Sequence, residues 1–179
     1  MYKRQILGRE ADLKSIVIKH PDASFFVAIG DNWIRHKVVE NILGLIPNAK
    51  FANAIHPSSI ISKSVTMGEG IVIMPGAIVN ANSQISNHCI IGTSSVIEHD
   101  CKVGMFSTLA PNATLGGGAS IGSFNMLGLA STVKHGISTG VHCVIGAGSV
   151  VLQNLDRYQV AYGIPAKVVR KRTEGEKYL

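Results

Sequence analysis

The sequence has few aromatic residues, few cysteines and no long apolar run, and each shortage argues against a class of protein. Aromatic residues make up 6% of the 179 residues, whereas nucleic-acid binders usually interleave them with a basic stripe. Three cysteines without a CxxC pair argue against a disulfide scaffold and a zinc knuckle. No apolar run approaches the roughly 18 residues of a membrane span, and the first residues do not form a signal peptide. We therefore expect a cytoplasmic protein that binds neither nucleic acid nor membrane.

Charge is concentrated at the two ends of the chain. Residues 1–54 carry eight Lys and Arg against five acids, residues 55–155 carry three against three, and residues 156–179 carry six against three. The basic C-terminal end is either solvated surface or a contact for a small polyanion such as coenzyme A.

An apolar residue recurs at every sixth position from Ile55 to Val151. Sixteen of these seventeen positions hold Ile, Val, Leu or Met, and the exception is Thr139. Four residues after most of them stands a small residue, a position that includes Cys89, Cys101 and Cys143. Glycine directly follows eight of the seventeen positions, which we interpret as a turn conformation that a Cβ would resist. A period of six fits neither a helix nor a simple strand. It indicates a short strand and a corner, so that three units close a triangular coil of eighteen residues.

This pattern resembles the hexapeptide repeat of left-handed parallel β-helix acyltransferases, and it covers residues 55–155. The resemblance implies an all-β dominated solenoid. The left hand comes from the resemblance alone, because the general preference for right-handed crossovers would predict the opposite.

Residues 1–54 follow a different pattern. Asp22–Gly30 is predicted to form a buried strand, and Asp31-Asn32 is predicted to cap a helix from Trp33 to about Leu45. The segment resembles the end of the small α/β domain that precedes the β-helix in sialic acid O-acetyltransferases and bacillosamine-type N-acetyltransferases. That domain opens with a glycine-rich loop for a nucleotide-sugar, which this segment lacks, so we expect a truncated α/β remnant.

His99 is the candidate general base. It lies in the sequence Val96-Ile97-Glu98-His99-Asp100, two residues after an inward position, and is flanked by two carboxylates that could orient its imidazole. The segment resembles the catalytic stretch of the same family, in which the histidine is the base and the following acid its partner. That resemblance implies Asp100 as the partner, while Glu98 remains possible.

Gly117 lies eighteen residues after His99 and is therefore predicted to stack directly above it. A glycine exposes its backbone N–H and allows close approach. In the resembled family the matching residue offers this N–H to the acetyl carbonyl, although Gly116–Gly118 could instead be only a flexible corner.

A further eighteen residues lead to His135, which raises the alternative of a γ-type carbonic anhydrase. That family binds zinc through histidines of adjoining subunits, and the place of its third ligand is Gly140 here. His88 and His142 share a register but lie three coils apart. A catalytic zinc needs three protein ligands, so we expect no metal.

The C-terminal segment, residues 156–179, contains Tyr162-Gly163-Ile164-Pro165-Ala166-Lys167. It resembles the turn that closes these β-helices beside coenzyme A. The resemblance implies that Gly163, Pro165, Ala166 and Lys167, together with Gly117, bind acetyl-CoA. Arg170, Lys171 and Arg172 could add contacts to the phosphates.

The resemblance implies an acetyl-CoA-dependent acyltransferase that acts on an amino-sugar or a sugar hydroxyl, possibly nucleotide-linked, and works as a homotrimer. Direct transfer would use His99, Asp100 and Gly117. The alternatives are acetylation of serine or another small molecule on the same scaffold, the metal enzyme described above, and a non-catalytic β-helix.

Overall fold

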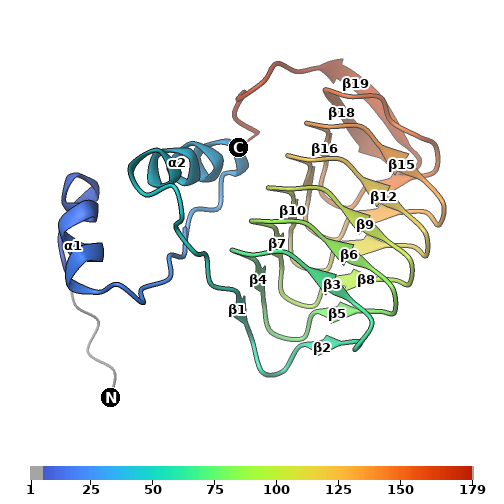
Figure 1. Ribbon diagram of the computed structural model, residues 1–179. Coiled ribbons are helices and arrows are strands. Elements are labelled where there is room, and N and C mark those ends of the chain that lie inside the picture. The colour runs from blue at the N-terminus through green and yellow to red at the C-terminus, as the bar shows by residue number, and fades with distance from the viewer. Residues whose placement is uncertain (1–5, 179) are drawn as a thin grey trace.

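The computed structural model describes residues 6–178, which form a parallel β-solenoid flanked by two helices (Figure 1). The first sheet contains β1 (Ala54–Ile55), β4 (Val72–Ile73), β7 (Ile90–Ile91), β10 (Thr108–Leu109), β13 (Met126–Leu127), β16 (Val144–Ile145), β18 (Gln159–Gly163) and β19 (Ala166–Lys171). The second contains β2 (Ile60–Ile61), β5 (Ile78–Val79), β8 (Val96–Ile97), β11 (Thr114–Leu115), β14 (Thr132–Val133) and β17 (Val150–Val151). The third contains β3 (Thr66–Met67), β6 (Gln84–Ile85), β9 (Lys102–Val103), β12 (Ser120–Ile121) and β15 (Ser138–Thr139).

The coils repeat every eighteen residues. Thr108 pairs with Ile90 on one side and with Met126 on the other, and the pairing is parallel. The chain thus passes through the first, second and third sheets in turn and returns one coil higher. The predicted left-handed parallel β-helix is confirmed.

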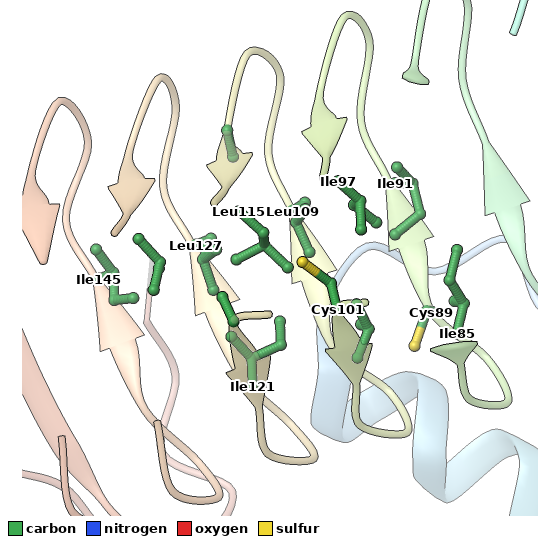
Figure 2. Close-up of a cluster of buried hydrophobic side chains, with 14 of the residues drawn as sticks. Ile85, Cys89, Ile91, Ile97, Cys101, Leu109, Leu115, Ile121, Leu127 and Ile145 are labelled. Atoms are coloured by element: carbon green, nitrogen blue, oxygen red, sulfur yellow. The ribbon is translucent and has the colours of Figure 1, made fainter. Parts of the chain in front are cut away.

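The inward apolar residues fill the interior of the coils. Ile91, Ile97, Leu109, Leu115 and Leu127 are each 0% exposed, and Figure 2 shows them stacked in successive coils. Ile55, by contrast, is 41% exposed, because the first coil ends the stack.

The small inward positions accept either serine or cysteine. The hydroxyl of Ser107 donates to the Gly122 carbonyl at 2.8 Å, and the thiol of Cys89 donates to the Gly104 carbonyl at 3.1 Å. Burial raises the pKa of the Cys89 thiol to about 12. The three cysteines are fully buried, as predicted, and act as small core residues.

The corner glycines have a different role from the predicted one. Gly104 and Gly122 do not have positive φ; a Cβ at Gly104 would lie 2.5 Å from the Gly122 carbonyl carbon, and at Gly122 2.7 Å from that of Gly140. These glycines therefore allow adjacent coils to approach closely. Left-handed φ occurs two residues later, at Phe106 (57°) and Phe124 (61°), for example.

The N-terminal region contains η1 (Glu10–Asp12), α1 (Leu13–Lys19) and α2 (Asn32–Leu45). The predicted helix is confirmed, since the Asp31 carboxylate caps α2 by accepting hydrogen bonds from the N–H groups of Trp33 and Ile34, both at 2.9 Å. The predicted strand at Asp22–Gly30 is wrong. Only Phe25 pairs, in a single bridge with Phe51, so the segment lacks the neighbouring ladder that a strand needs.

The C-terminal segment contains a β-hairpin. β18 and β19 are antiparallel, and they turn between Gly163 and Ala166 through a cis Ile164–Pro165 bond. In Figure 1 this hairpin covers one end of the solenoid, and the chain then returns toward α2. No helix within residues 6–178 is long and apolar enough to cross a membrane.

Candidate active site

His99 lies at the corner between the second and third sheets, just after β8. Its side chain is 63% exposed and that of Asp100 is 56% exposed. A single chain therefore provides only one wall of a site around the imidazole.

Asp100, rather than Glu98, contacts the His99 imidazole. His99 Nδ1 lies 2.8 Å from Asp100 Oδ2, whereas Glu98 Oε2 accepts a hydrogen bond from Asn80 at 3.0 Å. Asp100 has φ of 59°, a left-handed conformation that Asp and Asn tolerate better than most residues. This conformation places its carboxylate beside the preceding side chain.

The Asp100 carboxylate is held in its ionised form. The hydrogen bond from His99, followed by that from Asn82 at 3.3 Å, keeps the pKa of this carboxyl below its usual value. An ionised Asp100 accepts a hydrogen bond from the Nδ1–H of a neutral imidazole, which leaves the lone pair on Nε2 free. Nε2 is therefore the basic atom of the pair.

Gly117 lies directly above this ring. A Cβ at Gly117 would be 2.6 Å from His99 Nε2 and 2.8 Å from its Cε1, and Gly118 N–H donates to the His99 carbonyl at 2.8 Å. The expected register of eighteen residues is therefore observed. Only a residue without a side chain leaves Nε2 accessible from this side.

The N–H of Gly117 makes no hydrogen bond within residues 6–178. The same is true of the matching residue one coil above, His135, so a free N–H is a general property of this corner. What distinguishes Gly117 is that its free N–H and its lack of a side chain coincide above a histidine.

His88 and His142 belong to an aromatic stack that was not predicted from the sequence. His88, Phe106, Phe124, His142 and Tyr158 stack with ring centroids 4.6–5.3 Å apart and interplanar angles of 4–17°. The first four recur every eighteen residues at the corner between the third and first sheets, a signal that was visible in the sequence.

Helix α2 packs against this stack through Trp33 and His36. His88 and His142 are 5% and 6% exposed, and burial lowers the pKa of both. Their rings serve packing, and within residues 6–178 no group of three His, Cys, Asp or Glu side chains is arranged to hold a metal ion.

The C-terminal hairpin lies further along the solenoid. Gly163 N–H donates to Ser149 Oγ at 3.0 Å, and Ser149 is three coils beyond Ser95, which precedes β8. At about 4.8 Å per coil, the turn is roughly 14 Å from the level of His99. Gly163, Pro165, Ala166 and Lys167 are thus separate from the His99 pair. They belong to the β18–β19 hairpin of the first sheet, and the contact with Ser149 places the turn beside the start of β17, the last strand of the second sheet.

The basic residues of the hairpin differ in availability. Lys167 is exposed. Arg170 pairs with Glu176 at 2.6 Å. Arg172 is 8% exposed and donates to the Glu176 carbonyl, so it faces the chain rather than a ligand. Of these basic residues only Arg170 forms an ion pair within residues 6–178, so Lys167 and Lys171 are the exposed cations without one.

No family model matches the chain. Among solved structures, PerB of Caulobacter crescentus, in complex with CoA and GDP-perosamine, is 39% identical with a TM-score of 0.81, and the match covers 88% of this chain and 75% of that one. The chain belongs to the hexapeptide-repeat sugar N-acetyltransferases. Variants of that Caulobacter enzyme in which one histidine is replaced by alanine or asparagine have the same fold.

Two further relatives agree with this membership. The acetyltransferase domain of PglB from Neisseria gonorrhoeae, in complex with acetyl coenzyme A, is 29% identical with a TM-score of 0.85 over 92% of this chain and 78% of that one. UDP-N-acetylbacillosamine N-acetyltransferase of Bacillus subtilis is 48% identical over 54 residues, which are 30% of this chain and 24% of that enzyme. The matched part thus spans about a quarter of this curated relative.

Proposed function

We propose that the chain transfers the acetyl group of acetyl-CoA to the amine of an amino-sugar, by direct attack and within a homotrimer. The observation that carries this proposal is the contact of 2.8 Å between His99 Nδ1 and Asp100 Oδ2, with Nε2 open beneath Gly117. Acetyl-CoA is a cytoplasmic metabolite, so the proposal includes a cytoplasmic location.

The reaction follows from this geometry. The lone pair of the acceptor nitrogen attacks the thioester carbonyl carbon while His99 Nε2 accepts the proton that the nitrogen loses. The carbonyl electrons move to oxygen, where the Gly117 N–H stabilises the developing charge. When the tetrahedral intermediate collapses, the C–S bond breaks and the thiolate of coenzyme A takes the proton from the imidazolium.

Asp100 supports both stages. As an ionised carboxylate it fixes the tautomer of His99 and stabilises the imidazolium that forms. It is a positioning residue and does not itself receive a proton.

The donor is proposed to lie along the second sheet, from His99 to the turn of the hairpin. Gly163, Pro165 and Ala166 supply backbone and apolar contacts, and Lys167 supplies a cation for the phosphates. This arrangement uses the roughly 14 Å between the two regions for the pantetheine arm.

The homotrimer is supported by the outer face of the second sheet. Its outward residues carry no charge: Ile60, Ile78, Val96, Thr114, Thr132 and Val150. The third sheet presents polar residues such as Gln84 and Lys102 instead. A closed ring that buries the uncharged face would bring a neighbouring chain beside the exposed His99.

Substitution of His99 tests the proposal. His99→Ala should lower kcat for release of the coenzyme A thiol by roughly 10²–10⁴-fold, measured against a panel of nucleotide-linked 4-amino-sugars, with the affinity for acetyl-CoA unchanged. The matched control is His135→Ala, two coils above and exposed. Retention of more than about a tenth of wild-type kcat by His99→Ala would show that another group is the base.

A further inference from the structure

A column of polar side chains leads up to the pair of His99 and Asp100 from the coils before it. Ser64, Asn82 and Asp100 occupy the same place in three successive coils, at the corner between the second and third sheets. The N–H of Asn82 donates to Ser64 Oγ at 3.0 Å, and Asn82 Nδ2 donates to Asp100 Oδ1 at 3.3 Å. Asn82 is therefore fixed by the coil below and contacts the carboxylate of the coil above.

The column of side chains ends at Asp100. The next two places at this corner hold Gly118 and Gly136, with φ of 68° and 67°, and neither offers a side chain to the Asp100 carboxylate. Within residues 6–178, Asn82 is thus its only hydrogen-bond partner besides His99. Asn82 shares the left-handed conformation, with φ of 60°. Glycine adopts this conformation most easily, so the fold of the corner does not require an asparagine.

The contact with Asn82 fixes the orientation of the Asp100 carboxylate. The backbone of Asp100 is already held, because its N–H donates to the Ala81 carbonyl at 2.9 Å. The side chain is 56% exposed, so nothing buried prevents it from turning into solvent. With Oδ2 on His99 and Oδ1 on Asn82, rotation of the carboxylate would break one contact or the other. A donated hydrogen bond also favours the ionised form that His99 needs as its partner.

We propose that Asn82 is a positioning residue for the transfer reaction: it holds the Asp100 carboxylate against His99 Nδ1 and thereby keeps Nε2 beneath Gly117. The inference rests on the proposed function, in which His99 is the base. Asn82 acts through Asp100. The other amide of the same corner, Asn80, binds Glu98 instead, at 3.0 Å. The two amides thus hold one carboxylate each, and only one of these carboxylates contacts the imidazole.

Removal of the Asn82 side chain is the first test, with release of the coenzyme A thiol measured against nucleotide-linked 4-amino-sugars. Asn82→Gly should lower kcat by roughly 3–10-fold, because an unsupported carboxylate orients His99 less well. The KM values of both substrates and the melting temperature should stay at wild type, since glycine suits φ of 60°. The matched control, Asn80→Ala, should keep the wild-type kcat. A wild-type kcat in Asn82→Gly would overturn the inference.

A double variant shows whether Asn82 acts through Asp100. Asp100→Asn by itself removes the carboxylate that Asn82 holds. Addition of Asn82→Gly to Asp100→Asn should therefore change kcat by less than about 2-fold, because residues of one hydrogen-bonded network are not additive. The full loss of Asn82→Gly in both backgrounds would mean that the two residues act independently, and the inference would be wrong.

The pH profile of kcat/KM gives a readout that a merely structural role would not move. Asn82→Asp keeps the size of the side chain and replaces the donor with a second carboxylate beside Asp100. The added negative charge stabilises the protonated form of His99, so the acidic limb of the profile should move to higher pH by about 0.5 unit. Glu98 keeps its contact with Asn80 and contributes equally in both proteins. An acidic limb at the wild-type position would contradict the inference.

Failure of this inference is distinguishable from failure of the proposed function. If the wild-type chain acetylates no amino-sugar, or if His99→Ala keeps wild-type activity, the proposed function fails and the inference fails with it. If His99→Ala is inactive while Asn82→Gly and Asn82→Asp behave as wild type, transfer through His99 stands and Asn82 has no part in it.

Discussion

Gly117 covers the imidazole of His99 so closely that a single methyl group would collide with it: a Cβ at Gly117 would lie 2.6 Å from Nε2. No positive φ is needed at Gly117, so alanine can adopt its backbone conformation without strain. The residue is therefore required for space and not for folding.

Gly117→Ala should lower kcat by roughly 100-fold, because displacement of a base by about 1 Å is enough to cause such a loss. The melting temperature should stay within a few degrees of wild type. Gly44→Ala is the control and should be fully active, because an added Cβ at Gly44 would have no atom within 4 Å. A wild-type kcat in Gly117→Ala would mean that the His99 imidazole does not act as the base in the position that the structure shows.

The two carboxylates beside His99 should behave differently. Asp100→Asn should lower kcat by roughly 10-fold or more, because it removes the ionised partner of Nδ1. Glu98→Gln should have little effect, since Glu98 contacts Asn80 and not the imidazole. Steady-state kinetics of the two variants test this difference. Equal losses of kcat would contradict the role of Asp100 as the partner of His99.

Substitution of Lys167 should affect the binding of acetyl-CoA but not that of the acceptor. Lys167→Glu should raise the KM for acetyl-CoA, more strongly at low ionic strength where screening is weak, and leave the acceptor KM unchanged. Arg172→Gln should instead lower the melting temperature, because Arg172 is buried against Glu176. If Lys167→Glu has no effect, and dephospho-CoA protects against heating as well as CoA does, the hairpin does not bind the phosphates.

The aromatic stack should make stability depend on pH. Burial lowers the pKa of His88 and His142 below the ordinary 6.5, so the unfolded chain binds protons that the folded chain does not. The stabilisation is complete above about pH 6.5 and is lost as the pH falls below it.

Thermal unfolding between pH 7.5 and 5 should therefore show a falling melting temperature, and the fall should be smaller in His88→Phe/His142→Phe. The exposed His135→Gln is the control. A double variant with the wild-type pH slope would exclude the stack as the cause.

The only polar residue in the inward series, Thr139, should be needed for stability. Asn125 Nδ2 donates to Thr139 Oγ1 at 2.6 Å, and Asn125 Oδ1 accepts from the Cys143 N–H at 2.6 Å, all within the solenoid. Thr139→Val restores the apolar pattern but leaves the buried side-chain amide of Asn125 without its hydrogen-bond acceptor. The variant should therefore lose about 1–3 kcal/mol of unfolding free energy. Thr132→Val, on the outer face of the second sheet, should be nearly neutral. A stabilising Thr139→Val in denaturant titrations would refute this account.

The sequence by itself determined the solenoid, the position of Gly117 above His99 and the burial of the three cysteines. These could be predicted because each contact in a solenoid joins residues a fixed distance apart, so a spacing of eighteen along the chain becomes adjacency in space. The cap of α2 by Asp31 could also be predicted, because it joins residues only two or three positions apart in the sequence.

Only the tertiary structure decided which carboxylate orients His99, why Thr139 is polar, and how α2 meets the solenoid. The choice of Asp100 depends on a left-handed corner conformation, and the docking of α2 on contacts such as that of Arg35 with His88, 53 residues apart. The Tyr178 hydroxyl donates a hydrogen bond to the carbonyl of Gly30, which is 148 residues away in the sequence. Such contacts have no period, because they depend on how a helix outside the repeat packs against a corner.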